Sequence, residues 1–188
     1  MGRTFTGTIT QRTDFSYVAA TDVGVTSYVD DDSNYFSRAF TSGTGENQAN
    51  RLYVGRFVLS AASTNMLLDL AGALEDIYGD AITMQDVKFL KVRNRGVRDE
   101  DGDYNPTAGA DITVGGADSN AMGSIFYGDQ EAKLLVRSGG CFMLVAPLDG
   151  YPVTAGSQDV LEIEYVGSEA SGGDVMVDVE LFGDDLTA

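Results

Sequence analysis

The sequence contains no histidine, and this absence removes several classes of enzyme site. Without an imidazole there is no Ser-His-Asp or Cys-His nucleophile arrangement, and no zinc site that depends on histidine. A hydrolase would have to use two carboxylates about 5 to 10 Å apart in a cleft. With 29 acidic residues in 188, pairs of acids occur by chance and predict no activity by themselves. We expect a protein that is not an enzyme, with no catalytic residue and no cofactor.

Cysteine and tryptophan are nearly as scarce. Cys141 is the only cysteine, so the chain cannot form an internal disulfide, and its place in an apolar run predicts a buried thiol. Tryptophan is absent altogether. Because sugar-binding platforms are generally built from exposed aromatic rings, this absence disfavours a carbohydrate-binding module, although nine tyrosines leave the class open.

Long apolar runs are also missing. The longest, from Cys141 to Ala146, is far shorter than the ~20 residues that span a bilayer. The first residues, MGRTFTGTITQRT, are polar and contain no apolar core of a secretory signal. We therefore expect no membrane partner.

Basic residues are few, 12 against 29 acidic ones, which gives a formal net charge of -17. Nucleic acids and anionic membranes would be repelled, because binding them requires clustered lysine and arginine. The densest basic stretch, KVRNRGVR (91–98), is followed directly by the acidic run DEDGD. The charge predicts a soluble, self-repelling surface and no nucleic-acid partner.

The acidic run imitates the opening of a calcium loop, with Asp99, Asp101 and Asp103 at alternate positions. Its glycine, Gly102, comes one residue before the third acid instead of one after it, and the twelfth position is Ala110 where a calcium loop has a bidentate glutamate. Asp30, Asp31 and Asp32 offer no better pattern. We interpret both runs as exposed turns and expect no metal site, although the sequence leaves open whether the first binds a cation.

Apolar residues instead recur with a period of two, which is typical of half-buried β-strands. The pattern is clearest at Leu161, Ile163 and Tyr165, and it extends over Val175–Leu181. Further segments of this kind are 52–59, 90–93 and 112–114, separated by frequent glycines. These features predict one all-β domain, an antiparallel sandwich or barrel.

Two stretches need separate interpretation. Residues 66–80, MLLDLAGALEDIYGD, have apolar residues at helical spacing, but Gly72 and Gly79 favour a strand through Leu70 followed by a turn or short helix. Residues 136–147, VRSGGCFMLVAP, predict a buried hairpin that turns at SGG, with its second strand ended by Pro147.

Several segments together resemble a family of tailed-phage virion proteins encoded beside capsid genes. The resemblance covers most of the chain, in the family's order, and is carried by FTSGTGENQAN (40–50), LLDLAGALEDIYGD (67–80), DVKFLKVRNRG (86–96), ITVGGAD (112–118), VRSGGCFMLVAPLDGYPVTAGSQDVLEIE (136–164) and VDVELFG (177–183). The chain departs from the family at RDEDGDYNPTAG (98–109) and near its N-terminus. The family is similar to jelly-roll capsid decoration proteins, also called cement proteins.

The resemblance implies a jelly-roll β-sandwich over residues 21–188, preceded by a short N-terminal arm or extended segment over residues 1–20. It implies a homotrimer on the outer surface of the virion capsid, where the protein binds and stabilises the major capsid protein. A receptor- or carbohydrate-binding β-sandwich of a phage tail or surface structure is the alternative, since one fold supports many functions.

The N-terminal residues supply the candidate contacts with the capsid. Residues 1–13 contain two bases, Arg3 and Arg12, and no acid, and they alternate Phe5 and Ile9 with threonines. This composition suits an arm that lies on another subunit. We predict that the arm buries Phe5 and Ile9 on the capsid protein or a neighbouring trimer, while Arg3 and Arg12 pair with acids there.

Overall fold

The chain forms β-strands almost throughout the part that is described. The computed structural model describes residues 4–11, 16–21, 24–29, 36–60, 63–72, 74–76, 78–99, 101–107, 109–166 and 173–185. Within these ranges there is no α-helix, and the only helical element is the 3-10 turn η1 (Gly123–Phe126). No helix in the described residues is long and apolar enough to cross a membrane. The expected all-β architecture is confirmed.

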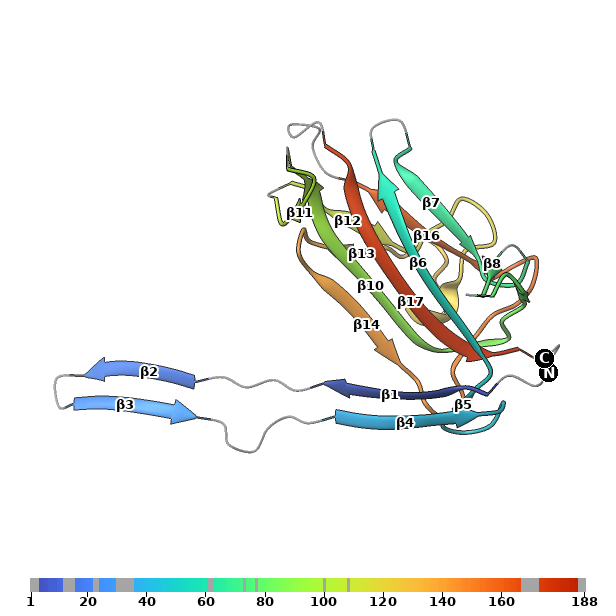
Figure 1. The fold of residues 1–188 in the computed structure, drawn as a ribbon, viewed down its shortest axis with the longest axis horizontal. Coiled ribbons are helices and arrows are strands. Elements are labelled where there is room, and N and C mark those ends of the chain that lie inside the picture. Colours follow the sequence, from blue (N-terminus) through green and yellow to red (C-terminus); the bar gives the residue numbers. More distant parts are fainter. Residues whose placement is uncertain are drawn as a thin grey trace.

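A large antiparallel sheet forms one layer of the body (Figure 1). Its strand order is β6-β17-β10-β14, and the short strands β11 and β15 also pair with β10. The members are β6 (Arg51–Leu59), β10 (Asp86–Arg98), β11 (Tyr104–Asn105), β14 (Cys141–Val145), β15 (Tyr151–Pro152) and β17 (Val175–Asp184). We call this layer the large sheet.

A second antiparallel sheet, the small sheet, has the order β7-β16-β12-β13. Its strands are β7 (Asn65–Asp69), β12 (Ile112–Val114), β13 (Leu134–Val136) and β16 (Val160–Tyr165). After β7 the chain turns and forms the two-stranded β8 (Leu74–Glu75) and β9 (Ala81–Ile82). This agrees with the strand and turn predicted for residues 66–80.

The main hydrophobic core contains residues from both sheets. In β17, Val175, Val177, Val179 and Leu181 are fully buried, while the residues between them are less buried on the opposite face. Ile163 of the small sheet belongs to the same cluster. Burial of each such side chain contributes about 1.5–3 kcal/mol to the stability of the fold. The apolar residues that recur with a period of two in the sequence therefore supply much of the core that holds the two sheets together.

A long two-stranded ribbon precedes the sandwich. β1 (Thr6–Gln11) pairs antiparallel with β4 (Phe36–Ser42), and between them β2 (Ser16–Thr21) pairs with β3 (Gly24–Val29). Figure 1 shows β2 and β3 beyond β1 and β4, away from the sandwich. The short β5 (Gln48–Ala49) adds to β4 in parallel. The predicted boundary at residue 20 lies within β2.

Aromatic rings fix the base of the ribbon to the outer face of the large sheet. The Phe182 ring lies 4.8 Å from that of Phe40, 4.9 Å from that of Phe89 and 5.1 Å from that of Phe5, measured between centroids. Ile9 also packs against this cluster. The ribbon therefore has its own small core, separate from the one between the sheets.

A buried lysine reinforces the same junction. Lys88 Nζ lies 2.9 Å from Asp184 Oδ2 and donates a 2.5 Å hydrogen bond to the carbonyl oxygen of Gly45, in the loop after β4. Burial, opposed by Lys88, raises the pKa of Asp184, and burial together with the charge of Asp184 raises the pKa of Asp86. The loop after β4, at the base of the ribbon, is thus joined to the sandwich by a hydrogen bond from a lysine that is itself ion-paired inside the large sheet.

The SGG stretch differs from the predicted hairpin. β13 and β14 on its two sides belong to different sheets, so Ser138–Gly140 is a crossing between layers. A hairpin would require the two strands to be neighbours, but β13 pairs with β12 and β14 pairs with β10. Phe142 and Leu144 do pack on the main core. Cys141 is exposed, which corrects the expected buried thiol, because it lies at the start of β14 with its side chain on the outer face.

Candidate interaction surface

The outer face of the large sheet is the most distinctive surface among the described residues. The base of the ribbon packs on the end of this face that contains Phe89, Met143 and Phe182, and the rest of the face, which includes the exposed Val58 and Arg93, lies beyond this cluster. Strand alternation turns every second residue of this remainder outward. The outward residues are Val54, Arg56 and Val58 of β6, Lys91, Arg93 and Arg95 of β10, Cys141 of β14, and Met176, Asp178 and Glu180 of β17. We call this set the open face.

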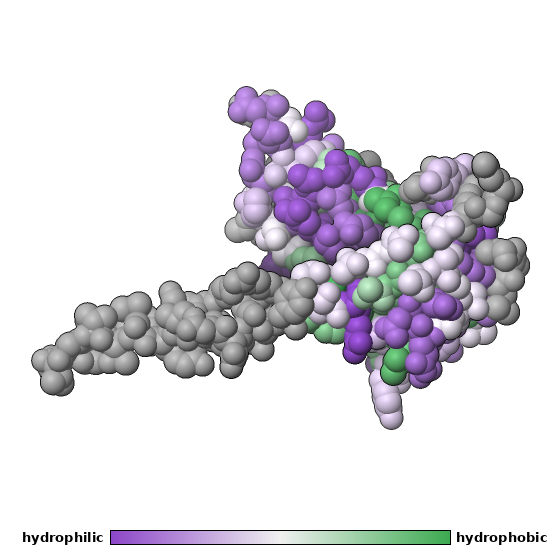
Figure 2. Space-filling view, turned by 60° about the horizontal axis from the view of Figure 1, so that its bottom comes forward, coloured by the Kyte–Doolittle hydropathy of each residue, from purple (hydrophilic) through white to green (hydrophobic). Residues whose placement is uncertain are grey.

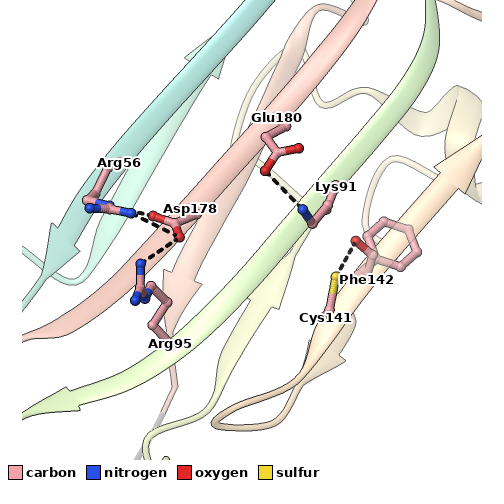
Figure 3. A network of polar contacts seen from close by, with 7 residues as sticks. All are labelled: Arg56, Lys91, Arg95, Cys141, Phe142, Asp178 and Glu180. Carbon is pink, nitrogen blue, oxygen red and sulfur yellow. Dashed lines mark hydrogen bonds and ion pairs between the residues drawn. The ribbon is translucent and has the colours of Figure 1, made fainter. Parts of the chain in front are cut away.

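Ion pairs cross the strands of the open face (Figure 3). Asp178 Oδ1 accepts a 2.7 Å hydrogen bond from Arg56 Nε, and Asp178 Oδ2 lies 3.3 Å from Arg95 Nη1. Lys91 Nζ lies 2.9 Å from Glu180 Oε1. Partial burial opposes ionisation of Asp178, but the hydrogen bond and charge of Arg56, with those of Arg95, outweigh it and lower the pKa of Asp178.

Basic residues exceed acidic ones on this face. Four bases, Arg56, Lys91, Arg93 and Arg95, stand beside two acids, so the local formal charge is +2 (4 - 2) in a chain of net charge -17. Arg93 is exposed, and its side chain makes no hydrogen bond or ion pair with another described residue. A locally positive surface on an acidic protein is suited to an acidic partner.

Apolar side chains and an open strand edge adjoin these charges. Val54 and Val58 are 54% and 45% exposed. Among the described strands β6 pairs only with β17, so one edge of this nine-residue strand is unpaired. In the view of Figure 2, apolar patches lie among polar surface. An uncovered edge beside exposed valines is a template for pairing with another chain.

Two hollows flank β1 where it crosses the large sheet. The larger, of 490 Å³, has an apolar floor that includes Leu52, Phe89 and Met143, and the smaller, of 220 Å³, lies beside Asn50 and Tyr78. Among the described residues each is lined by one carboxylate, Glu180 and Asp76 respectively. Neither hollow therefore presents the pair of acids that a carboxylate hydrolase requires.

Two of the four predicted capsid contacts lie in the described residues. Phe5 and Ile9 are half-buried on the chain's own large sheet, in the cluster around Phe182. Arg3 and Arg12 lie outside the described residues. Contact of the four with a capsid protein stays a prediction, and for Phe5 and Ile9 it competes with packing inside the chain.

The acidic loop after β10 satisfies its own polar groups. Asp99 Oδ1 accepts hydrogen bonds from the backbone N–H groups of Asp101 and Asp103, and Asp99 Oδ2 accepts one from Asn105 Nδ2. This carboxylate orders a turn, as expected of an exposed loop. No set of three acidic or thiol side chains within the described ranges could hold a metal ion. Asp30, Asp31 and Asp32 lie outside the described residues.

Comparison of the chain with known protein families, proteins and structures finds no relative. No protein-family model, no curated protein and no solved structure matches the chain. Function is therefore inferred from the sequence segments and from the geometry of the sandwich, the ribbon and the open face.

Sequence reasoning did not identify the open face. Its residues are separated by up to 126 positions, from Val54 to Glu180, and most of them alternate with core residues. The available signal was the basic stretch KVRNRGVR, whose alternate members point outward from β10. Without the strand order, nothing in the sequence brings Arg56 beside Arg95.

Proposed function

We propose that the chain is a structural protein of a tailed-phage virion that decorates the outer surface of the capsid. The observation that carries the proposal is the nested pairing of the eight main strands of the sandwich. In chain order they are β6, β7, β10, β12, β13, β14, β16 and β17. In chain order the first pairs with the last, the second with the seventh, the third with the sixth, and the fourth with the fifth. Nested pairing of this kind supports a jelly roll, in which an antiparallel ribbon is rolled into two sheets, and viral capsid proteins commonly use that fold.

The sequence segments support the same function. The quoted segments that resemble phage decoration proteins include FTSGTGENQAN, DVKFLKVRNRG and VDVELFG, and they correspond to the ribbon's base, β10 and β17. A projecting ribbon fixed to a rigid sandwich suits a protein that spans neighbouring subunits of a shell. The proposed partners are the major capsid protein and two further copies of this chain, in a homotrimer.

The test is binding to heads that lack the protein. Purified chain is mixed with undecorated heads of the parent phage and with isolated tails, and both are sedimented. We expect the chain to pellet with heads, to saturate at a fixed number of copies per shell and to leave tails bare. Pelleting with tails, or with neither particle, overturns the proposal.

A receptor- or carbohydrate-binding module is the second candidate, and one residue favours it. Tyr127 follows η1 with a positive φ of 58° and its side chain is fully exposed, at 105% of the reference value. Exposed aromatic rings are what sugar platforms use. Binding to a glycan array that Tyr127→Ala abolishes would support this candidate, and an array without any binding would exclude it.

A further inference from the structure

The tip of the ribbon packs on neither of the two sheets within the described residues. In the described part of the molecule β2 and β3 make their substantial contacts with each other, and Figure 1 shows both away from the two sheets. An isolated two-stranded hairpin is marginally stable in water, because its residues bury too little apolar surface. A hairpin of this length is expected to gain its order from another surface.

The sequence of the hairpin is that of a covered element. The twelve residues of β2 and β3 include no charged residue, whereas 22% of the whole chain is charged. The register places Val18 and Ala20 at positions on one face with Val25 and Val29, and it places Tyr17 directly opposite Tyr28 on the other. Exposed edges of natural sheets usually carry charges that prevent pairing, and the two strands of this hairpin carry none.

The open face offers what such a hairpin needs. It presents Val54 and Val58 beside the unpaired edge of β6 and carries a local formal charge of +2. Along the sequence, residues 14–32, which span the hairpin, include five aspartates and no base. The hairpin region and the open face are therefore opposite in charge and both partly apolar, although they belong to the same acidic chain.

We propose that the β2–β3 hairpin of one copy docks on the open face of a second copy. The ribbon carries the hairpin away from its own sandwich, so the contact joins two molecules. Such a contact is heterologous, because one copy contributes the hairpin and the other the face, and it forms a ring when the rotation between copies closes. The proposal does not rest on the capsid function, and it is tested without heads.

The test uses two variants that each remove one side of the contact. In the hairpin-less variant, residues 16–29 are replaced by Asn-Gly, a turn that closes two-residue hairpins. In the face variant, Val58→Glu and Arg93→Glu change two exposed side chains that make no ion pair with any described residue. Leu135→Glu is the matched control, because Leu135 is also 45% exposed but lies on the small sheet.

Light scattering gives the mass of each protein, and circular dichroism checks that each is folded. We expect the full chain and the Leu135→Glu control to form a multiple of 20.0 kDa. Each contact variant alone should be monomeric, with self-association at least tenfold weaker. A mixture of the two should form a one-to-one complex, since one partner still has a hairpin and the other still has an open face.

Three results overturn the proposal: a monomeric full chain, a contact variant that keeps the parent mass, or a mixture that stays monomeric. These results are separable from the head-binding test. A chain that self-associates through the hairpin but ignores heads would overturn the capsid function alone. A monomer that binds heads would overturn the docking of the hairpin on a second copy alone.

Discussion

Individual residues at the base of the ribbon are unusually costly to replace. Lys88 has a side chain only 2% exposed and pairs with Asp184, whose Oδ1 atom has no hydrogen-bond partner among the described residues. Removing one member of a buried pair leaves an uncompensated charge. We expect Lys88→Met to lower the free energy of unfolding by about 3–5 kcal/mol, measured by urea denaturation at neutral pH.

The double variant Lys88→Met/Asp184→Asn provides the control for this substitution. It removes both charges, so we expect it to recover much of the lost stability. If the double variant is as unstable as Lys88→Met, the loss comes from packing of the lysine stem and the ion pair is not its cause.

Replacing the neighbouring carboxylate of Asp86 should raise the stability of the fold, whereas replacing Lys88 should lower it. Burial and the charge of Asp184 raise the pKa of Asp86, so ionised Asp86 is less favourable in the folded protein than in the unfolded chain. A folded pKa above the unfolded one adds stability that is present below the unfolded pKa and is lost as pH rises through the folded pKa. Asp86→Asn should therefore unfold at higher denaturant concentration than the parent at pH 7.

The gain from Asp86→Asn should shrink as the pH falls through the folded pKa of Asp86, where the parent also carries a neutral side chain. Asp178→Asn is the contrasting case, because the pKa of Asp178 is lowered and its ionised form is stabilising at neutral pH. Equal stability of Asp86→Asn and parent at every pH would mean that ionised Asp86 is not disfavoured by folding.

At the scale of elements, the sequence predicted correctly those strands that bury every second residue in the core and turn the others outward. The alternation in β17 and β16 identified both strands and their buried faces, because a strand exposed on one side records its environment in every second residue. It failed at Cys141 and at SGG, where the outcome depends on which sheet receives the next strand. Phe5 and Ile9 were identified as apolar contacts, but the sequence could not say that the large sheet of the same chain would cover them.

We expect the ribbon to open locally while the sandwich stays folded. Phe182 is the common neighbour of Phe5, Phe40 and Phe89, so Phe182→Ala removes the centre of the cluster that fixes the ribbon. Truncating a buried phenylalanine costs about 3–5 kcal/mol. We expect amide hydrogen exchange in β1 and β4 to accelerate more than exchange in the small sheet.

Leu181→Ala is the matched substitution on the other face of β17. Leu181 is fully buried between the two sheets, so its loss should accelerate exchange in β16 and β12 as well as in β17. The same exchange pattern in both variants would mean that the ribbon and the sandwich unfold together.

At the scale of the whole molecule, two electrostatic effects oppose each other when copies meet. Each copy has a net charge of -17, which repels at long range, while the open face carries +2 and would attract an acidic segment at contact. The Debye length falls from about 30 Å at 0.01 M salt to about 8 Å at 0.15 M, so added salt removes the repulsion between whole bodies first. We expect self-association to strengthen as the salt concentration rises from 0.01 M to 0.15 M, measured by light scattering at fixed protein concentration.

The face variant supplies the control, because its substitutions make the open face acidic and it should stay monomeric at both salt concentrations. Self-association that is strongest at the lowest salt would contradict this prediction. The attraction between the open face and the acidic segment would then outweigh the repulsion between the net charges of the two copies.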